Sequence, residues 1–158
     1  MALNLSKLSV LLVDDTAAMR DLLQTVLQDL GVGQIYTAGD GDRGFQVFCK
    51  NNPDIVLIDW EMEPVTGLDL TRKIRTDSQS PNRMVPIIFL TGYTAPRRIA
   101  KARDLGVTEF LAKPFTAEGL INRITYVINK PRDYVQAPRF FGPDRRRRKD
   151  GDYSGSNK

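Results

Sequence analysis

The sequence predicts an α/β fold in which a (βα)5, doubly wound, five-stranded parallel sheet lies between two layers of helices. Three apolar runs of four residues, at 10–13, 55–58 and 87–90, are rich in β-branched types, as strands buried on both faces are. Amphipathic segments with helical spacing separate these runs. Because strands and helices alternate along the chain, we expect parallel strands joined by right-handed crossovers.

The first helix follows the first run and has the clearest apolar stripe. Its members recur at helical spacing: Met19, Leu22, Leu23, Val26, Leu27 and Leu30. Gly31 should end this helix. Weaker patterns predict the second strand at 34–38 and the fifth at 109–112. The other helices are expected at about 41–51, 68–75, 96–105 and 116–129, where Pro53 and Pro131 follow the first and the last of them.

The apolar periodicity stops after Asn129, so we expect one domain over residues 1–129, then a linker and flexible basic tail over 130–158. The chain has 158 residues, 23 basic and 19 acidic. Nine basic and four acidic residues fall in 130–158, which leaves 14 basic and 15 acidic residues in 1–129. The net charge of +4 therefore belongs to the tail.

The composition excludes several classes of function. The chain has no His and one Cys, Cys49, which excludes a Ser-His-Asp triad, an imidazole metal site, a Cys-type zinc site and an internal disulfide. Cys49 is expected to be a small apolar filler. No apolar run approaches the ~18 residues of a membrane span, so a cytoplasmic location is expected.

Polar side chains stand at the carboxyl ends of the predicted strands, where open parallel sheets bind ligands. They are Asp14 and Asp15 after the first strand, Asp59 at the third, Thr91 at the fourth and Lys113 at the fifth. Clustered carboxylates need a cation, and hard oxygen ligands favour Mg²⁺. A metal, an ammonium and a hydroxyl make a site for a phosphoryl group, which leaves Asp59 as a nucleophile that forms an acyl phosphate.

These residues resemble the receiver domain of bacterial two-component response regulators, a flavodoxin-like fold. The resemblance covers about residues 8–129 and is carried by Asp14-Asp15, Leu57-Ile58-Asp59, Leu90-Thr91-Gly92 and Lys113-Pro114-Phe115, with Gly67 and Phe110 at matching spacing. It implies a signalling protein, not an enzyme, with weak autophosphorylation and autodephosphorylation only. Its partners would be a histidine kinase or phosphotransfer protein as donor, and a downstream protein.

The resemblance also implies a role for each site residue. Asp59 would accept the phosphoryl group. Asp15 would bind Mg²⁺ directly and Asp14 mainly through water, with Asp59 and the backbone carbonyl of Glu61 as further ligands. Lys113 would pair with the phosphate and Thr91 would turn inward to bond it.

Phe110 stands at the position of the family's aromatic switch. The resemblance implies that Phe110 would move into the space that Thr91 vacates when it turns inward.

The loop after Asp59 departs from the family, because Glu63 stands at the usual proline position and Pro64 comes one residue later. The positions of Glu61 and Tyr93 tune the lifetime of the phosphate in the family.

Two alternative functions remain open. Gly39, Gly41 and Gly44 form a literal G-x-G-x-x-G motif, as in a dinucleotide-binding enzyme, although a turn with close helix packing is the favoured interpretation.

The tail holds an aromatic pair and a basic run: Phe140, Phe141, Arg145, Arg146, Arg147 and Arg148. We expect it to contact a partner protein, with nucleic acid or an anionic membrane surface as alternatives to a merely solubilising tail.

Overall fold

The computed structural model describes residues 4–60, 67–92 and 96–129, together with the backbone of 134–137 and 140–143. After a short 3-10 helix at Leu5–Lys7, the strands of the main sheet are β1 (Ser9–Val13), β2 (Gln34–Ala38), β3 (Ile55–Asp59), β4 (Ile87–Thr91) and β5 (Glu109–Ala112). The helices are α1 (Ala17–Asp29), α2 (Gly41–Asn51), α3 (Gly67–Thr76), α4 (Pro96–Asp104) and α5 (Ala117–Asn129). The predicted order of strands and helices is confirmed.

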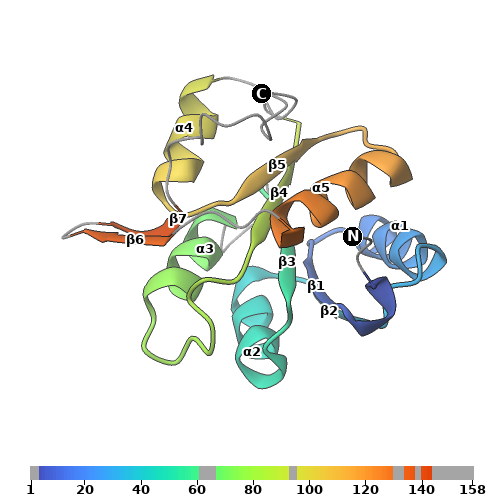
Figure 1. Ribbon diagram of the computed structural model, residues 1–158, viewed down its shortest axis with the longest axis horizontal. Helices are drawn as coiled ribbons and strands as arrows, with labels where there is room; N and C mark the ends of the chain where they lie inside the picture. Colours follow the sequence, from blue (N-terminus) through green and yellow to red (C-terminus); the bar gives the residue numbers. More distant parts are fainter. Residues whose placement is uncertain (1–3, 61–66, 93–95, 130–133, 138–139, 144–158) are drawn as a thin grey trace.

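All five strands are parallel, in the order β2-β1-β3-β4-β5. Consecutive strand residues point to opposite faces of a sheet, and both faces are covered here. Val13, Ile58 and Phe89 belong to a core shared with α2, α3 and α4. Leu12 and Leu57 belong to a second core shared with α1 and α5. The continuous apolar runs predict a sheet with a layer of helices on each face, and Figure 1 shows the sheet between its helices.

Helix α1 ends as the sequence predicts. Its cap Leu30 is followed by Gly31 at φ +94°, a left-handed conformation that glycine adopts without a Cβ clash. One residue of the predicted stripe differs, because Leu22 is 51% exposed whereas Leu23 and Leu27 are buried. The buried face of α1 is therefore narrower than the apolar stripe in its sequence, since only one side of the helix packs on the sheet.

A buried arginine, Arg75, fastens the end of α3 to two loops. Its side chain is fully buried. The guanidinium donates hydrogen bonds to the backbone oxygens of Arg83 (2.7 Å), Val85 (2.7 Å) and Gly106 (2.9 and 3.0 Å). The loop before β4 and the turn before β5 are thus held by one side chain.

Two further strands follow the domain. β6 (Tyr134–Ala137) and β7 (Phe140–Pro143) pair antiparallel in a separate sheet, and β7 contacts α3 (Figure 1). The predicted linker and tail did not include this hairpin, because its short strands have no alternating polar and apolar pattern. Within the described part of the chain, no helix is long and apolar enough to cross a membrane.

Candidate functional site

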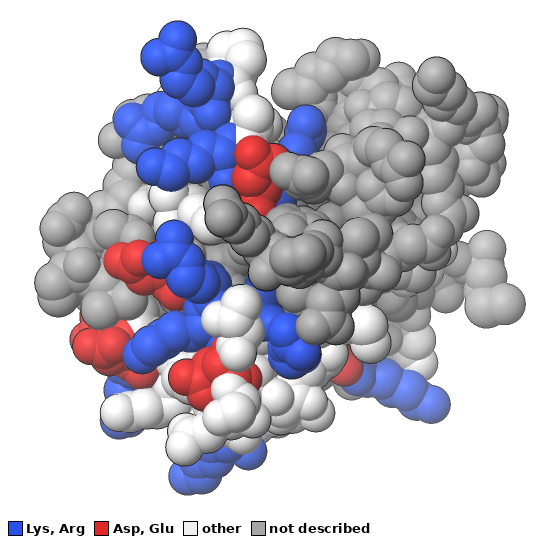
Figure 2. Space-filling view, turned by 90° about the vertical axis from the view of Figure 1, so that its left-hand side faces the viewer, with Lys and Arg blue, Asp and Glu red and all other residues white. Residues whose placement is uncertain are grey.

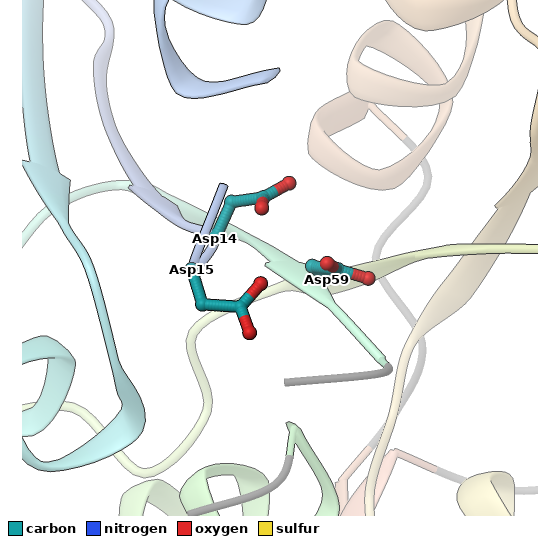
Figure 3. Close-up of side chains that lie close together, drawn as sticks. All are labelled: Asp14, Asp15 and Asp59. Carbon is teal, nitrogen blue, oxygen red and sulfur yellow. The ribbon is translucent and has the colours of Figure 1, made fainter. Parts of the chain in front are cut away.

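Three carboxylates lie together at the carboxyl ends of two neighbouring strands. Val13 of β1 is in register with Ile58 of β3, so the next residue in each, Asp14 and Asp59, comes to the same edge of the sheet. Asp15 follows directly. One carboxylate oxygen from each of the three aspartates lies within 4.8 Å of the others, and Figure 3 shows the three side chains gathered at the ends of β1 and β3.

Asp14 is held in place by its neighbours but keeps one oxygen for a ligand. The Thr16 N–H donates to Asp14 Oδ1 (2.8 Å), and Arg20 Nη1 donates to the Asp14 backbone oxygen (2.7 Å). Asp14 Oδ2 is buried and accepts no hydrogen bond from any described residue. Buried polar atoms are normally satisfied. An orphaned oxygen among two further carboxylates therefore fits a bound hard cation such as Mg²⁺.

The electrostatics of Asp14 agree with this interpretation. Burial raises the pKa of Asp14 from 3.8 to about 6, and the nearby Asp59 and Asp15 carboxylates add to the rise. The hydrogen bond from Thr16 and the charge of Lys113 lower the pKa but do not outweigh burial. Without a cation, the site thus resists holding three ionised carboxylates.

Lys113 and Thr91 complete the same edge. Lys113 Nζ lies 3.1 Å from Asp59 Oδ1, and Asp59 is only 5% exposed. The backbone N–H of Lys113 donates to the Thr91 backbone oxygen (2.8 Å), which ties the ends of β4 and β5 together. Thr91 is 2% exposed. The structure therefore brings together the strand-end residues that the sequence predicts: three acids, one hydroxyl and one ammonium.

Phe110 lies in the interior, in a group of rings that we call the aromatic cluster: Trp60, Phe89 and Phe110. The Phe110 ring centroid is 6.2 Å from that of Phe89, edge to face, and 6.1 Å from that of Trp60. The centroids of Trp60 and Phe89 are 5.4 Å apart. Sequence reasoning missed the part of Trp60 in this cluster. Its position directly after Asp59 was the available signal.

Several predicted site residues lie outside the described part of the chain. They are Glu61, Tyr93, Arg145, Arg146, Arg147 and Arg148. Phe140 and Phe141 fall in β7, of which only the backbone is described.

The glycine motif has a structural explanation. Asp40 is the N-cap of α2, and its side chain accepts a hydrogen bond from the Arg43 N–H (2.7 Å). A Cβ atom on Gly44 would lie 3.1 Å from both Val13 methyl carbons and 3.2 Å from a Leu70 methyl carbon. The motif therefore caps a helix and lets it pack closely on the sheet, as the favoured sequence interpretation predicts.

Comparisons with known proteins agree with the fold and the site. The family model described as the response regulator receiver domain matches residues 10–125 of the chain. The chain is 31% identical over 123 residues to the chemotaxis protein CheY of Pseudomonas aeruginosa, which covers 78% of this chain and 98% of that protein. The chemotaxis response regulator CheY4 of Vibrio cholerae superposes with a TM-score of 0.70 at 32% identity, covering 76% of this chain and 98% of that one.

A further solved structure contains a metal. It is the receiver domain of the sensor histidine kinase PA1611 from Pseudomonas aeruginosa, with a magnesium ion coordinated in its active site cleft. Its TM-score is 0.69 at 26% identity, covering 78% of this chain and 98% of that one. From the fold, the match of the family model and these relatives, the chain belongs to the response regulator receiver domain family, whose members are signalling proteins.

Proposed function

We propose that this protein is a phosphorylation-activated response regulator that accepts a phosphoryl group on Asp59 and signals by a change in its surface. The observation that supports this most is the pairing of Asp59 with Lys113 at 3.1 Å, beside two further aspartates. A carboxylate with an ammonium on one side and cation ligands on the other suits transfer of an anionic group.

Mg²⁺ would be held by Asp15 directly, by Asp14 mainly through water, by Asp59 and by the backbone carbonyl of Glu61. The orphaned, buried Asp14 Oδ2 supports this assignment. When bound, the metal would neutralise charge on the oxygens of the transferring phosphoryl group.

The donor would be a phosphohistidine on a histidine kinase or phosphotransfer protein, which is consistent with a chain that has no His. An Asp59 carboxylate oxygen attacks the phosphorus, a P–O bond forms, and the P–N bond breaks with its electron pair passing to the imidazole. Lys113 then pairs with a phosphoryl oxygen, and the Thr91 hydroxyl donates a hydrogen bond to another.

The output would be binding of a partner protein, with the face around α4 and β5 as the surface that changes when Thr91 and Phe110 move. The tail would add to this contact through Phe140, Phe141 and the basic run at 145–148. Nucleic acid binding by that run is the alternative, and it predicts a gel shift that weakens steeply with salt. Since the proposed donors act inside the cell, we propose a cytoplasmic location.

The central claim can be tested with acetyl phosphate, an acyl phosphate that acts as a small donor, in the presence of Mg²⁺. Intact-mass measurements should show one added phosphoryl group on the wild type and none on Asp59→Asn. Asp21→Asn is a matched control, because Asp21 is exposed on α1 and is not one of the strand-end residues. If Asp59→Asn were labelled as fully as the control, the proposed acceptor would be wrong.

A further inference from the structure

Helix α4 is unusually basic, and two of its arginines contact the aromatic cluster. Its nine residues include Arg97, Arg98, Lys101 and Arg103 against a single acid, Asp104. Figure 2 shows several Lys and Arg side chains on the face of the molecule that carries α4. The basic side chains of this helix therefore do more than face solvent, because two of them contact buried rings.

The two contacts are cation–π in geometry. Arg98 Cζ lies 5.2 Å from the ring centroid of Trp60, and Arg103 Cζ lies 5.8 Å from that of Phe110. Both distances fall within the ~6 Å range of this interaction. Arg98 is exposed and Trp60 is buried, so the guanidinium covers the cluster from the solvent side.

The Trp60 ring is coupled to the carboxylate site by the chain itself. Trp60 directly follows Asp59 at the end of β3, and its backbone N–H donates to the Leu90 backbone oxygen (3.2 Å), next to Thr91. A change at the end of β3 that accompanies occupation of the site would therefore move the ring on which Arg98 lies.

Little else holds α4 to the domain by burial. Ala102 is the one fully buried residue of the helix, and Ile99 is partly buried against the core. Helices with few buried apolar contacts open and shift at low free-energy cost. The cation–π contacts of Arg98 and Arg103 add to this small buried area.

We propose that Arg98 is a positioning residue that couples α4 to Trp60, so that the position of α4 depends on what the carboxylate site binds. This inference rests on the proposed function, because it concerns the occupied site. It assigns to Arg98 a role that the strand-end residues alone do not provide.

The test is hydrogen exchange of the α4 amides in the full-length protein, in three states: metal-free, with Mg²⁺, and with Mg²⁺ plus beryllofluoride as a phosphoryl mimic. In the metal-free state, Arg98→Ala should exchange about two- to fivefold faster in α4 than the wild type. It should also lose most of the change that beryllofluoride causes there. Arg98→Lys should restore part of both effects. Arg97→Ala is the matched control, with the same charge loss on an exposed neighbour.

Trp60 is the single tryptophan of the sequence, so its fluorescence reports occupation of the neighbouring site. Exchange of the β3 amides next to Asp59 reports the same occupation independently of α4. If Arg98→Ala and Arg97→Ala showed the same α4 exchange and the same response, the coupling would be wrong and the proposed function would stand. If wild-type protein showed no fluorescence change and no protection near Asp59, the proposed function itself would fail.

A second variant keeps the test decisive if Arg98→Ala does not fold. Trp60→Phe retains an aromatic side chain but weakens the cation–π contact, so α4 exchange should rise in it as well. In the double variant Arg98→Ala/Trp60→Phe, the two effects should be less than additive, because both changes act on the same contact. Additive effects would contradict the inference.

Discussion

Replacement of Asp14 by Asn should stabilise the metal-free protein at neutral pH while weakening its response to Mg²⁺. The amide keeps an oxygen that can accept the hydrogen bond from the Thr16 N–H, which reaches Asp14 Oδ1 at 2.8 Å in the wild type. What the variant loses is a buried negative charge beside Asp15 and Asp59. Stability and function should thus change in opposite directions, as is common for strained functional sites.

The magnitude follows from the pKa of Asp14, which rises from 3.8 to about 6 in the folded protein. A pKa raised by folding means that the folded state binds protons more tightly. The wild type therefore loses stability as pH increases from about 4 to above 6, and it is penalised in full at pH 7.5. The shift corresponds to about 3 kcal/mol. Because the exposed Asp15 opens the site to solvent screening, we expect about 1–2 kcal/mol, or about 4 °C in Tm.

The assay is thermal or urea unfolding in EDTA at pH 4.5, 6 and 7.5, with Asp21→Asn as the control. The stability gain of Asp14→Asn should be about a third of its full value at pH 4.5, reach most of it at pH 6 and level off near pH 7.5. Adding Mg²⁺ should then stabilise the wild type more than the variant, because a ligand stabilises the state that binds it. A variant that is less stable than the wild type by the same amount at every pH would refute the reasoning.

Two other predictions concern regions outside the site. Arg75→Met should cost about 2–4 kcal/mol of unfolding free energy, because the backbone oxygens of Val85 and Gly106 would lose the guanidinium as donor. Arg72→Met, a change at an exposed residue of the same helix, should cost far less. Equal losses of stability in urea unfolding would contradict this role of Arg75. Truncation after residue 143 removes the basic run but keeps β6 and β7. It should leave the extent of acetyl phosphate labelling of Asp59 within about twofold of the wild type. Loss of labelling would show that the tail is needed for phosphorylation.

Much of the fold and the position of the site could be predicted from the sequence, because local pattern and topology point to the same answer. Runs of four apolar residues indicated strands buried on both faces, and parallel strands bring their carboxyl ends to one edge. Asp14, Asp59 and Lys113 could be placed together without any knowledge of distances.

Other features depend on packing that no periodic pattern records. The sequence pattern of α3 places Arg75 in a basic helix end, where solvent exposure is the usual outcome, yet the residue is buried because two loops supply its acceptors. Leu22 belongs to the apolar stripe but is exposed, since α1 meets the sheet with one side only. The contact between Arg98 and Trp60 joins residues 38 positions apart, a separation that no local pattern records.

The charges of the site explain why a cation and a phosphoryl donor should act together. Asp14, Asp15 and Asp59 with Lys113 carry a net charge of −2 when all are ionised, and burial raises the pKa of Asp14 rather than letting that charge form freely. One Mg²⁺ would neutralise it. An incoming phosphoryl group would then meet a neutral site with an ammonium in place, whereas without the metal it would meet a repulsive one. The same carboxylates that would destabilise the metal-free fold would thus also make the proposed phosphorylation depend on the metal.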